Sequence, residues 1–168
     1  HQLTLQGGHW QPFLKPSDLG KSKVMLTAFY PAPQTPVEPE LHVITCAVQT
    51  DQSSEEGYLQ SDLLGAQHEM IMNNSDKEVS MTFCHLMHRL NISLTGLDTN
   101  ASDFALEVYG RTQGLFDSSA KGSLQPDEDS PEEWIIPHKT GDGRYICLIA
   151  PQPVDIGEDR IRIVCNGK

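Results

Sequence analysis

The chain has 168 residues and a formal net charge of −11, from 23 acidic and 12 basic residues. A surface this acidic repels phosphate backbones and anionic lipids, so we expect no nucleic-acid or lipid-surface partner. No apolar run is long enough to span a membrane, and the length suits one domain, 1–168.

The N-terminal half predicts short strands separated by turns, because apolar residues recur with period 2 and Gly and Pro punctuate the chain. Leu3–Leu5 and Trp10–Phe13 flank a glycine pair and predict a hairpin. The polar segment Asp51–Tyr58 is interpreted as a loop. The other expected elements are a strand at Lys23–Tyr30, a proline-rich surface loop at Pro31–Pro39, a strand at Leu41–Gln49, and a turn with a short strand at Ser61–Gln67 that Met70–Ile71 continues.

The most informative segment is Glu78–Leu94, which holds two alternating apolar ladders. The first contains Val79, Met81 and Phe83, and the second contains Leu90, Ile92 and Leu94. The insert Cys84–Arg89 breaks the phase between them. Two half-buried strands are therefore expected, joined by a bulge or by a bend that changes sheets.

The C-terminal half continues the all-β pattern, and no segment of about 12 residues has a helical period. Ser118–Pro131 is acidic and poor in apolar residues, which predicts a long mobile loop. The remaining strands are expected at Phe104–Gly110, Trp134–Pro137, Arg144–Ala150 and Asp159–Cys165, with a tight turn at Gly141-Asp142-Gly143 and a final hairpin turn at Pro151–Gly157.

The four cysteines are widely spaced and form no CxxC pair, which excludes a zinc ribbon and a thioredoxin-type motif. They are Cys46, Cys84, Cys147 and Cys165. Cys147 and Cys165 fall in strands predicted to be neighbours and are the better disulfide candidates. Buried free thiols remain an equal alternative, because a strand cysteine packs as a small hydrophobe.

Cys84, His85 and His88 resemble a metal cluster, but residues three apart in an extended segment point to opposite faces. We therefore favour packing over a metal site and expect His85 to be a core histidine bonded to backbone. No phosphate-binding glycine loop and no GxSxG elbow occurs. The carboxylates of Asp127–Glu133 lie in a predicted flexible loop, so neither an enzyme nor a cofactor is expected.

Trp10, with His9 and Phe13 nearby, could stack on a sugar ring, or could cover the end of the sandwich. Trp134 has the same two interpretations. Its neighbours Ile135 and Ile136 favour a buried strand.

Four motifs in order, from Trp10 to Gly167, resemble the fimbrillin-like (Mfa-like) proteins of Bacteroidales. Each motif is weak alone, and their shared order makes the resemblance specific. The motifs are Trp10 with Thr27-Ala28-Phe29-Tyr30-Pro31; Asp51-Gln52 with Ser61-Asp62-Leu63-Leu64-Gly65-Ala66; Phe83, His85, Leu86 and Arg89; and Ile149-Ala150-Pro151-Gln152 with Ile161–Gly167.

The resemblance implies a transthyretin-like β-sandwich of about seven or more mostly antiparallel strands with long loops. It implies export, usually as a lipoprotein, and display at the outer membrane or cell surface. Other fimbrillin-like subunits would be the partners, bound through an open sheet edge by strand exchange. The motif residues Asp51, Gln52, Asp62, Phe83, His85, Pro151 and Gln152 are given structural roles, and none is catalytic.

The resemblance leads us to expect opening strands and a second sandwich domain that these 168 residues do not show, so the chain is interpreted as a fragment or as a minimal member of the family. Two functions therefore stand. The first is a structural or adhesive subunit of a surface fimbria without chemistry of its own. The second is a stand-alone module that binds a glycan or host ligand through Trp10 and the loops Gln34–Glu40 and Ser118–Glu133.

Overall fold

The computed structural model describes residues 4–6, 9–11, 23–32, 43–71, 79–119, 124–153 and 159–165, with backbone alone for 4–6 and 9–11. Antiparallel strands dominate these residues, and one short helix accompanies them. In chain order the elements are β1 (Thr4–Gln6), β2 (His9–Gln11), β3 (Lys23–Tyr30), β4 (Val43–Ala47), α2 (Glu55–Ser61), β5 (Leu64–Ile71), β6 (Cys84–His85), β7 (His88–Ser93), β8 (Ala105–Arg111), β9 (Gln113–Asp117), β10 (Leu124–Pro126), β11 (Glu132–Ile135), β12 (His138–Gly141), β13 (Arg144–Ile149) and β14 (Ile161–Val164).

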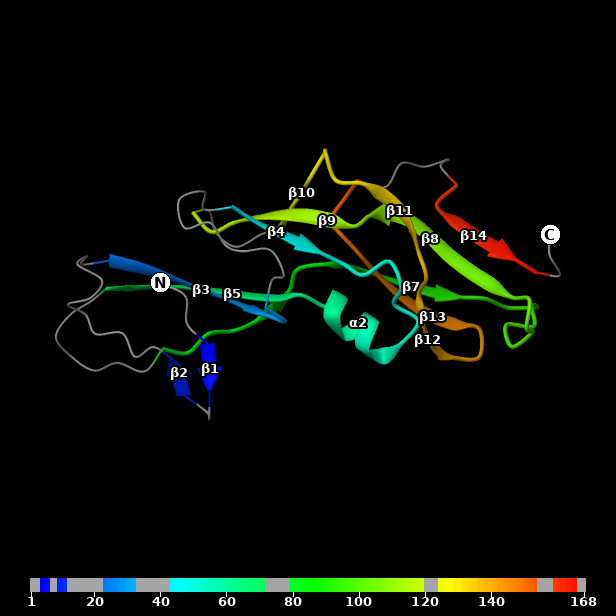
Figure 1. The fold of residues 1–168 in the computed structure, drawn as a ribbon, viewed down its shortest axis with the longest axis horizontal. Helices are drawn as coiled ribbons and strands as arrows, with labels where there is room; N and C mark the ends of the chain where they lie inside the picture. The colour runs from blue at the N-terminus through cyan, green and yellow to red at the C-terminus, as the bar shows by residue number, and fades with distance from the viewer. Residues whose placement is uncertain are drawn as a thin grey trace.

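The strands from β3 onward form two layers, each made of two three-stranded sheets placed end to end, and β1 and β2 form a separate two-stranded sheet (Figure 1). One layer holds β10-β9-β4 and β11-β8-β14, and the other holds β3-β5-β6 and β12-β13-β7. One continuous stretch joins the sheets of each layer: β8 runs into β9 through Thr112, and β6 runs into β7 through Leu86-Met87. The predicted all-β fold is confirmed, and its transthyretin-like topology stays a prediction.

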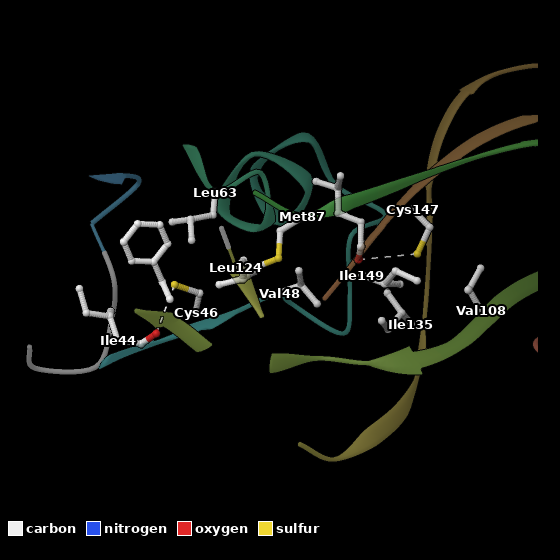
Figure 2. Close-up of a cluster of buried hydrophobic side chains, with 12 residues drawn as sticks. Ile44, Cys46, Val48, Leu63, Met87, Val108, Leu124, Ile135, Cys147 and Ile149 are labelled. Carbon is white, nitrogen blue, oxygen red and sulfur yellow. Dashed lines mark hydrogen bonds between the residues drawn. The ribbon is translucent and has the colours of Figure 1, made fainter. Parts of the chain in front are cut away.

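An apolar core lies between the layers and holds them together, since burial of apolar surface is the main force favouring folding (Figure 2). Phe29 of β3 meets Phe116 of β9 edge to face, with 4.9 Å between ring centroids, so the two layers are in contact there. The buried members of the core are Ile44, Cys46, Val48, Leu63, Met87, Val108, Phe116, Leu124, Ile135, Cys147, Leu148 and Ile149.

Most predicted strands are present with small shifts of their ends. The β1–β2 hairpin pairs Gln6 with His9 across the predicted glycine turn. The bounds of β3 match the prediction, and the strand ends at a cis Tyr30–Pro31 bond. The tight turn before β13 is also confirmed, with Gly143 at φ +64°.

The Glu78–Leu94 prediction is right in its second half and wrong in its first. β7 places Leu90 and Ile92 against the core as expected. Residues 79–83 form no strand, and Phe83 is 40% exposed. The predicted change of sheet occurs, because β6 pairs with β5 whereas β7 pairs with β13.

The predicted loop Asp51–Tyr58 is corrected by α2, which begins inside it. The Ser54 hydroxyl accepts a hydrogen bond from Gly57 N at 3.0 Å and caps the helix. Glu55 and Glu56 lie in the first turn, where their negative charges interact favourably with the positive end of the helix dipole. In the part of the chain that the structure describes, no helix is long and apolar enough to cross a membrane.

Two further C-terminal predictions are wrong. The segment expected as a long mobile loop contains β10, which pairs with β9. The expected final hairpin does not form, because β14 pairs with β8 instead of β13. Cys147 lies in β13 and Cys165 directly follows β14, which belongs to a different sheet, and both thiols are free.

Candidate functional site

The side chain of Gln52 continues a β-ladder where a strand stops. Pairing of β12 with β13 reaches only Ile146. Beyond it, Gln52 Nε2 donates to Leu148 O at 2.7 Å, and Leu148 N donates to Gln52 Oε1 at 2.9 Å. Nε2 also donates to Gln49 O at 3.0 Å, and Gln52 is fully buried. The amide thus satisfies backbone groups that a neighbouring strand would otherwise bind.

In the other layer, the side chain of Gln152 binds the edge of β8 beyond the pair of Ile161 with Val108, where pairing with β14 begins. Arg111 N donates to Gln152 Oε1 at 2.9 Å, and Ala150 N donates to Arg111 O at 3.0 Å. Pro151 is buried between these two residues. The Ala150–Gln152 segment therefore completes the edge of β8 and ties the two layers together.

The other motif residues lie at or near the surface. Hydrogen bonds from Ser53 Oγ and Ser53 N hold the pKa of Asp51 below its ordinary value. Asp62 accepts a hydrogen bond from His85 Nδ1 at 2.6 Å. The His85 side chain is 72% exposed, so the expected core histidine bonded to backbone is wrong.

Trp10 lies in β2, where it pairs with Leu5 of β1. Its side chain is outside the described residues, so a sugar-stacking role stays a prediction. Trp134 is half-buried: its ring packs 5.1 Å from that of Tyr109, and the Arg162 guanidinium lies 4.2 Å from its centroid.

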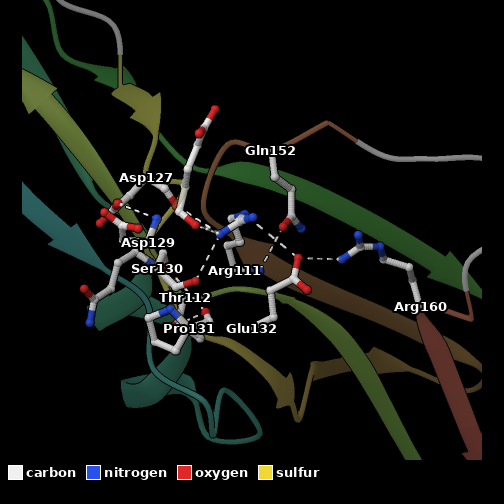
Figure 3. A network of polar contacts seen from close by, with 11 residues as sticks. Arg111, Thr112, Asp127, Asp129, Ser130, Pro131, Glu132, Gln152 and Arg160 are labelled. Atoms are coloured by element: carbon white, nitrogen blue, oxygen red, sulfur yellow. Dashed lines mark hydrogen bonds and ion pairs between the residues drawn. The ribbon is translucent and has the colours of Figure 1, made fainter.

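Arg111 fixes the connection between β10 and β11, as Figure 3 shows. Its Nη1 donates to the carbonyls of Asp127 at 3.1 Å, Glu128 at 2.8 Å and Ser130 at 3.0 Å. Its Nε lies 3.9 Å from Glu132 Oε1. Nη1 carries two N–H groups, so one of them is shared between two of these carbonyls. The residues after β10 are thereby held to β8.

The role of Arg111 was not predicted from the sequence, where its only local signal is one basic residue at the end of an alternating strand. Arg111 binds the backbone carbonyls of Asp127 and Glu128 rather than their carboxylates. Within the described ranges, no group of three or more His, Cys, Asp or Glu residues is placed to hold an ion, and this includes Cys84, His85 and His88.

The cysteines nearest the core act as packing groups. Burial raises the pKa of Cys46 and of Cys147 to about 12, because the thiolate is poorly solvated there. Both thiols lie in the core of Figure 2. Since the thiolate is the reactive form, neither residue suits nucleophilic chemistry.

One edge of the β12-β13-β7 sheet is open in the described part of the chain. Leu148 turns its backbone N–H and C=O away from β7, toward Gln52. Antiparallel alternation therefore directs the backbone groups of Leu90 and Ile92 toward β13 and those of Arg89 and Asn91 outward. No described strand pairs with that outer side of β7.

Apolar side chains are exposed over the same side of the sandwich. β8 and β13 are the central strands of two facing sheets and contact each other. The connection Ile136-Pro137 joins β11 to β12 at one edge of this pair of sheets. β14 and β7 therefore lie at the opposite edge. Arg162 points outward to Glu107. Ile161 and Ile163 alternate with it and face inward, yet they are 50% and 38% exposed. Among the residues that the structure describes, this side combines backbone groups that pair with no strand and apolar side chains that are exposed.

The chain belongs to the fimbrillin-like family, whose pattern matches residues 18–168. This membership confirms the resemblance carried by the four motifs. No curated protein matches the chain significantly.

Solved structures that share the fold include two proteins from Bacteroides. A putative cell adhesion protein from Bacteroides uniformis has 19% sequence identity and a TM-score of 0.58, over 86% of this chain and 55% of that one. A putative cell adhesion protein from Bacteroides thetaiotaomicron has 19% identity and a TM-score of 0.57, over 96% of this chain and 62% of that one. The chain thus spans less than two thirds of the length of either protein.

Proposed function

We propose that the chain is a non-enzymatic structural or adhesive subunit of a bacterial surface fimbria, or a related cell-surface protein, and that it assembles by β-strand exchange. Its precursor would be exported as a lipoprotein and displayed at the outer membrane. Membership of the fimbrillin-like family supports this proposal, as do the names of the two similar structures.

The observation that carries the assembly proposal is the exposed inner face of β14 beside the open edge of β7. An added strand would satisfy the outward backbone groups of Arg89 and Asn91. Its alternate side chains would cover Ile161 and Ile163, which are 50% and 38% exposed. Burying apolar surface and completing a ladder in one step favours a stable, slowly exchanging contact.

The test is the substitution Asn91→Pro, which removes an outward N–H from β7. Proline is tolerated on an edge strand where its missing donor faces away from the neighbour, so the fold should persist. We expect the wild-type chain, with partner subunits, to form SDS-resistant ladders on unheated gels, and Asn91→Pro to lose them.

Asn91→Ala is the matched control, because it removes the same side chain but keeps the N–H. It should assemble like the wild type. Assembly of Asn91→Pro at wild-type level, or a wild-type chain that stays monomeric with every partner subunit in sedimentation velocity, would refute strand exchange at β7.

A glycan- or host-ligand-binding role at Trp10 is the second proposal. Its support is that β1 and β2 form a separate two-stranded sheet that carries the tryptophan. Trp10→Ala should abolish binding on a glycan array and leave the β-rich circular-dichroism spectrum intact. An unchanged array profile would count against this role.

A further inference from the structure

A cleft of about 320 Å³ lies beside the first half of β8, on the side opposite β14. It exists because β11 leaves β8 after the Ile135–Val108 pair. Ile136 turns away to bond elsewhere: its N donates to Thr50 O at 2.8 Å, and its O accepts from Gln52 N at 2.9 Å. The divergence leaves a gap along Ala105–Glu107 where β11 would have continued.

One wall of the cleft is a strand edge. Tyr109 N donates to Arg160 O on the β14 side. Backbone groups alternate in direction along an antiparallel strand, so Leu106 directs its N–H and C=O toward the cleft. β14 pairs with Ala105–Glu107 on its other side, but among the described residues no strand pairs with them on the cleft side. The wall therefore presents the donor and acceptor of one ladder position.

The lining beside this edge is apolar and aromatic. Phe104 and Tyr145 stack with 6.1 Å between their ring centroids, and both contribute to the cleft. Tyr145 is 7% exposed, and Ile136 at the margin is 40% exposed. This surface can accept a branched aliphatic side chain by burying its apolar area.

Lys139 adds a positive charge to the same cleft. Its Nζ donates to Thr99 O at 3.0 Å and to Asn100 Oδ1 at 2.6 Å, and it lies 5.9 Å from the Tyr145 centroid. In the described part of the chain it forms no ion pair with a carboxylate. Two acceptors leave one of its three N–H donors for a ligand.

We propose that this cleft binds an extended peptide of another protein, one that carries a branched aliphatic residue followed directly by a carboxylate. The peptide backbone pairs with Leu106 and extends the β11 position along β8. Its aliphatic side chain packs on Phe104 and Tyr145, and its carboxylate contacts Lys139. A peptide fits this cleft better than a sugar, because the alternating backbone donor and acceptor match another strand.

The site is distinct from the proposed assembly edge, since β7 and β14 lie on the other side of the sandwich. Blocking peptide binding should therefore leave strand exchange unchanged. Conversely, Asn91→Pro should bind the peptide as well as the wild type does, so failure of one proposal is distinguishable from failure of the other.

The first experiment uses the unmodified chain and acetylated tetrapeptides of alternating threonine and valine that end in valine. We expect the free-acid peptide to shift the backbone amide NMR signals of Leu106 and Glu107. The C-terminal amide should bind about tenfold more weakly, because it lacks the charge that Lys139 binds. A peptide with an N-methylated internal residue should also weaken, because it loses a ladder donor.

A further peptide separates the sources of the carboxylate: it ends in an amide and carries an aspartate after the valine. Binding like the free acid indicates recognition of a side-chain carboxylate, and weak binding indicates recognition of a C-terminus. Both results keep the proposal. No shift at Leu106 with any peptide would overturn it, as would equal binding by the N-methylated peptide.

The substitution Lys139→Met tests whether the Lys139 charge binds the peptide carboxylate, and Lys23→Met is the matched control. Lys23 lies on β3 and pairs with Glu69 at 2.7 Å, away from the cleft. We expect Lys139→Met to erase the difference between the acid and amide peptides, and Lys23→Met to preserve it. If Lys139→Met lowers the melting temperature, the test is the difference in affinity between the acid and amide peptides for the wild type. Equal binding of the two peptides by the wild type would refute the role of Lys139.

Discussion

Gln52 and Gln152 show how a side chain can replace backbone. Each amide binds main-chain groups of a strand beyond the point where the neighbouring strand ends. The family resemblance identified both glutamines from the sequence, but their roles could not be derived from it. The partner of Gln52 lies 96 positions away along the chain, at Leu148, and no local pattern encodes such a contact.

Gln52→Met should destabilise the protein more than Gln152→Met. The first change leaves Leu148 N and O buried without their partner, at a cost of about 3 kcal/mol, and the second removes one bond to Arg111 N, at a cost of about 1 kcal/mol. Methionine nearly conserves side-chain volume, so cavity effects stay small. Urea denaturation measures both losses of stability. Equal losses would contradict the role of the Gln52 amide in satisfying Leu148 N and O.

The buried thiols predict a loss of stability at alkaline pH. Burial raises the pKa of Cys46 and of Cys147 from 9.0 to about 12, so the folded state holds protons that the unfolded state releases. Their contribution is fully present below pH 9 and falls as pH rises toward 12, by about 1.4 kcal/mol per pH unit for each thiol.

Denaturation midpoints of the wild type and of the Cys46→Ala/Cys147→Ala double variant should therefore converge as pH rises above 9. The double variant starts less stable, because it loses packing volume, but its pH slope should be shallower. The two proteins share every other side chain, so the difference between their slopes belongs to the two thiols. Parallel slopes in the two proteins would show that neither thiol contributes.

At the scale of elements, alternation of apolar residues correctly predicted strands that pair with another strand. It predicted a strand wrongly where no described strand is available for pairing. β3, β7, β8 and β13 lie where the sequence predicts them. Residues 79–83 alternate equally well but pair with no described strand. An apolar period specifies which side chains share a face, whereas a strand also needs a partner for its hydrogen bonds.

The missed elements have equally specific causes. α2 has 7 residues and is too short to show a helical period, although the Ser54 cap and two glutamates in the first turn were present in the sequence. The ordered connection after β10 was not predicted, because Arg111 binds its backbone carbonyls. Every residue type carries the same carbonyl, so the sequence gives no signal for this contact.

The turn between β12 and β13 should tolerate no side chain at Gly143. Its φ is +64°, and a Cβ there would lie 2.4 Å from Leu94 O, so Gly143→Ala forces the backbone to move. Gly96 has φ +77°, and a Cβ there would meet no heavy atom within 4 Å, which makes it the matched control.

Gly96→Ala should cost about 1–2 kcal/mol from left-handed strain alone. Gly143→Ala should cost more, because strain and a clash with backbone add together. Thermal melting of the two variants gives the comparison. A Gly143→Ala loss no larger than that of Gly96→Ala would mean that the Leu94 contact relaxes freely.

At the scale of the molecule, one core runs through both sheets of each layer. It contains Ile44 and Phe116 from one end and Val108 and Cys147 from the other. Alternation in the sequence predicted that Leu90 and Ile92 pack on the core, as they do. It could not predict that each layer is divided into two sheets, because the division depends on where strands change partners in space.

The continuous core predicts one cooperative unfolding transition. In a Trp10→Phe background, Trp134 is the sole tryptophan of the chain. It reports on the β11-β8-β14 sheet, whereas far-ultraviolet circular dichroism reports on all strands. The two signals should change at the same temperature. Separate midpoints would show that the two ends of the sandwich unfold independently.

The stretch 105–117 imposes a parity rule on the evolution and engineering of this protein. It carries two sheets on one backbone with unbroken alternation of buried residues, so adding one residue inside it would turn the interior side chains of one half to the solvent while the other half stayed correct. Insertions or deletions within 105–117 must therefore come in even numbers.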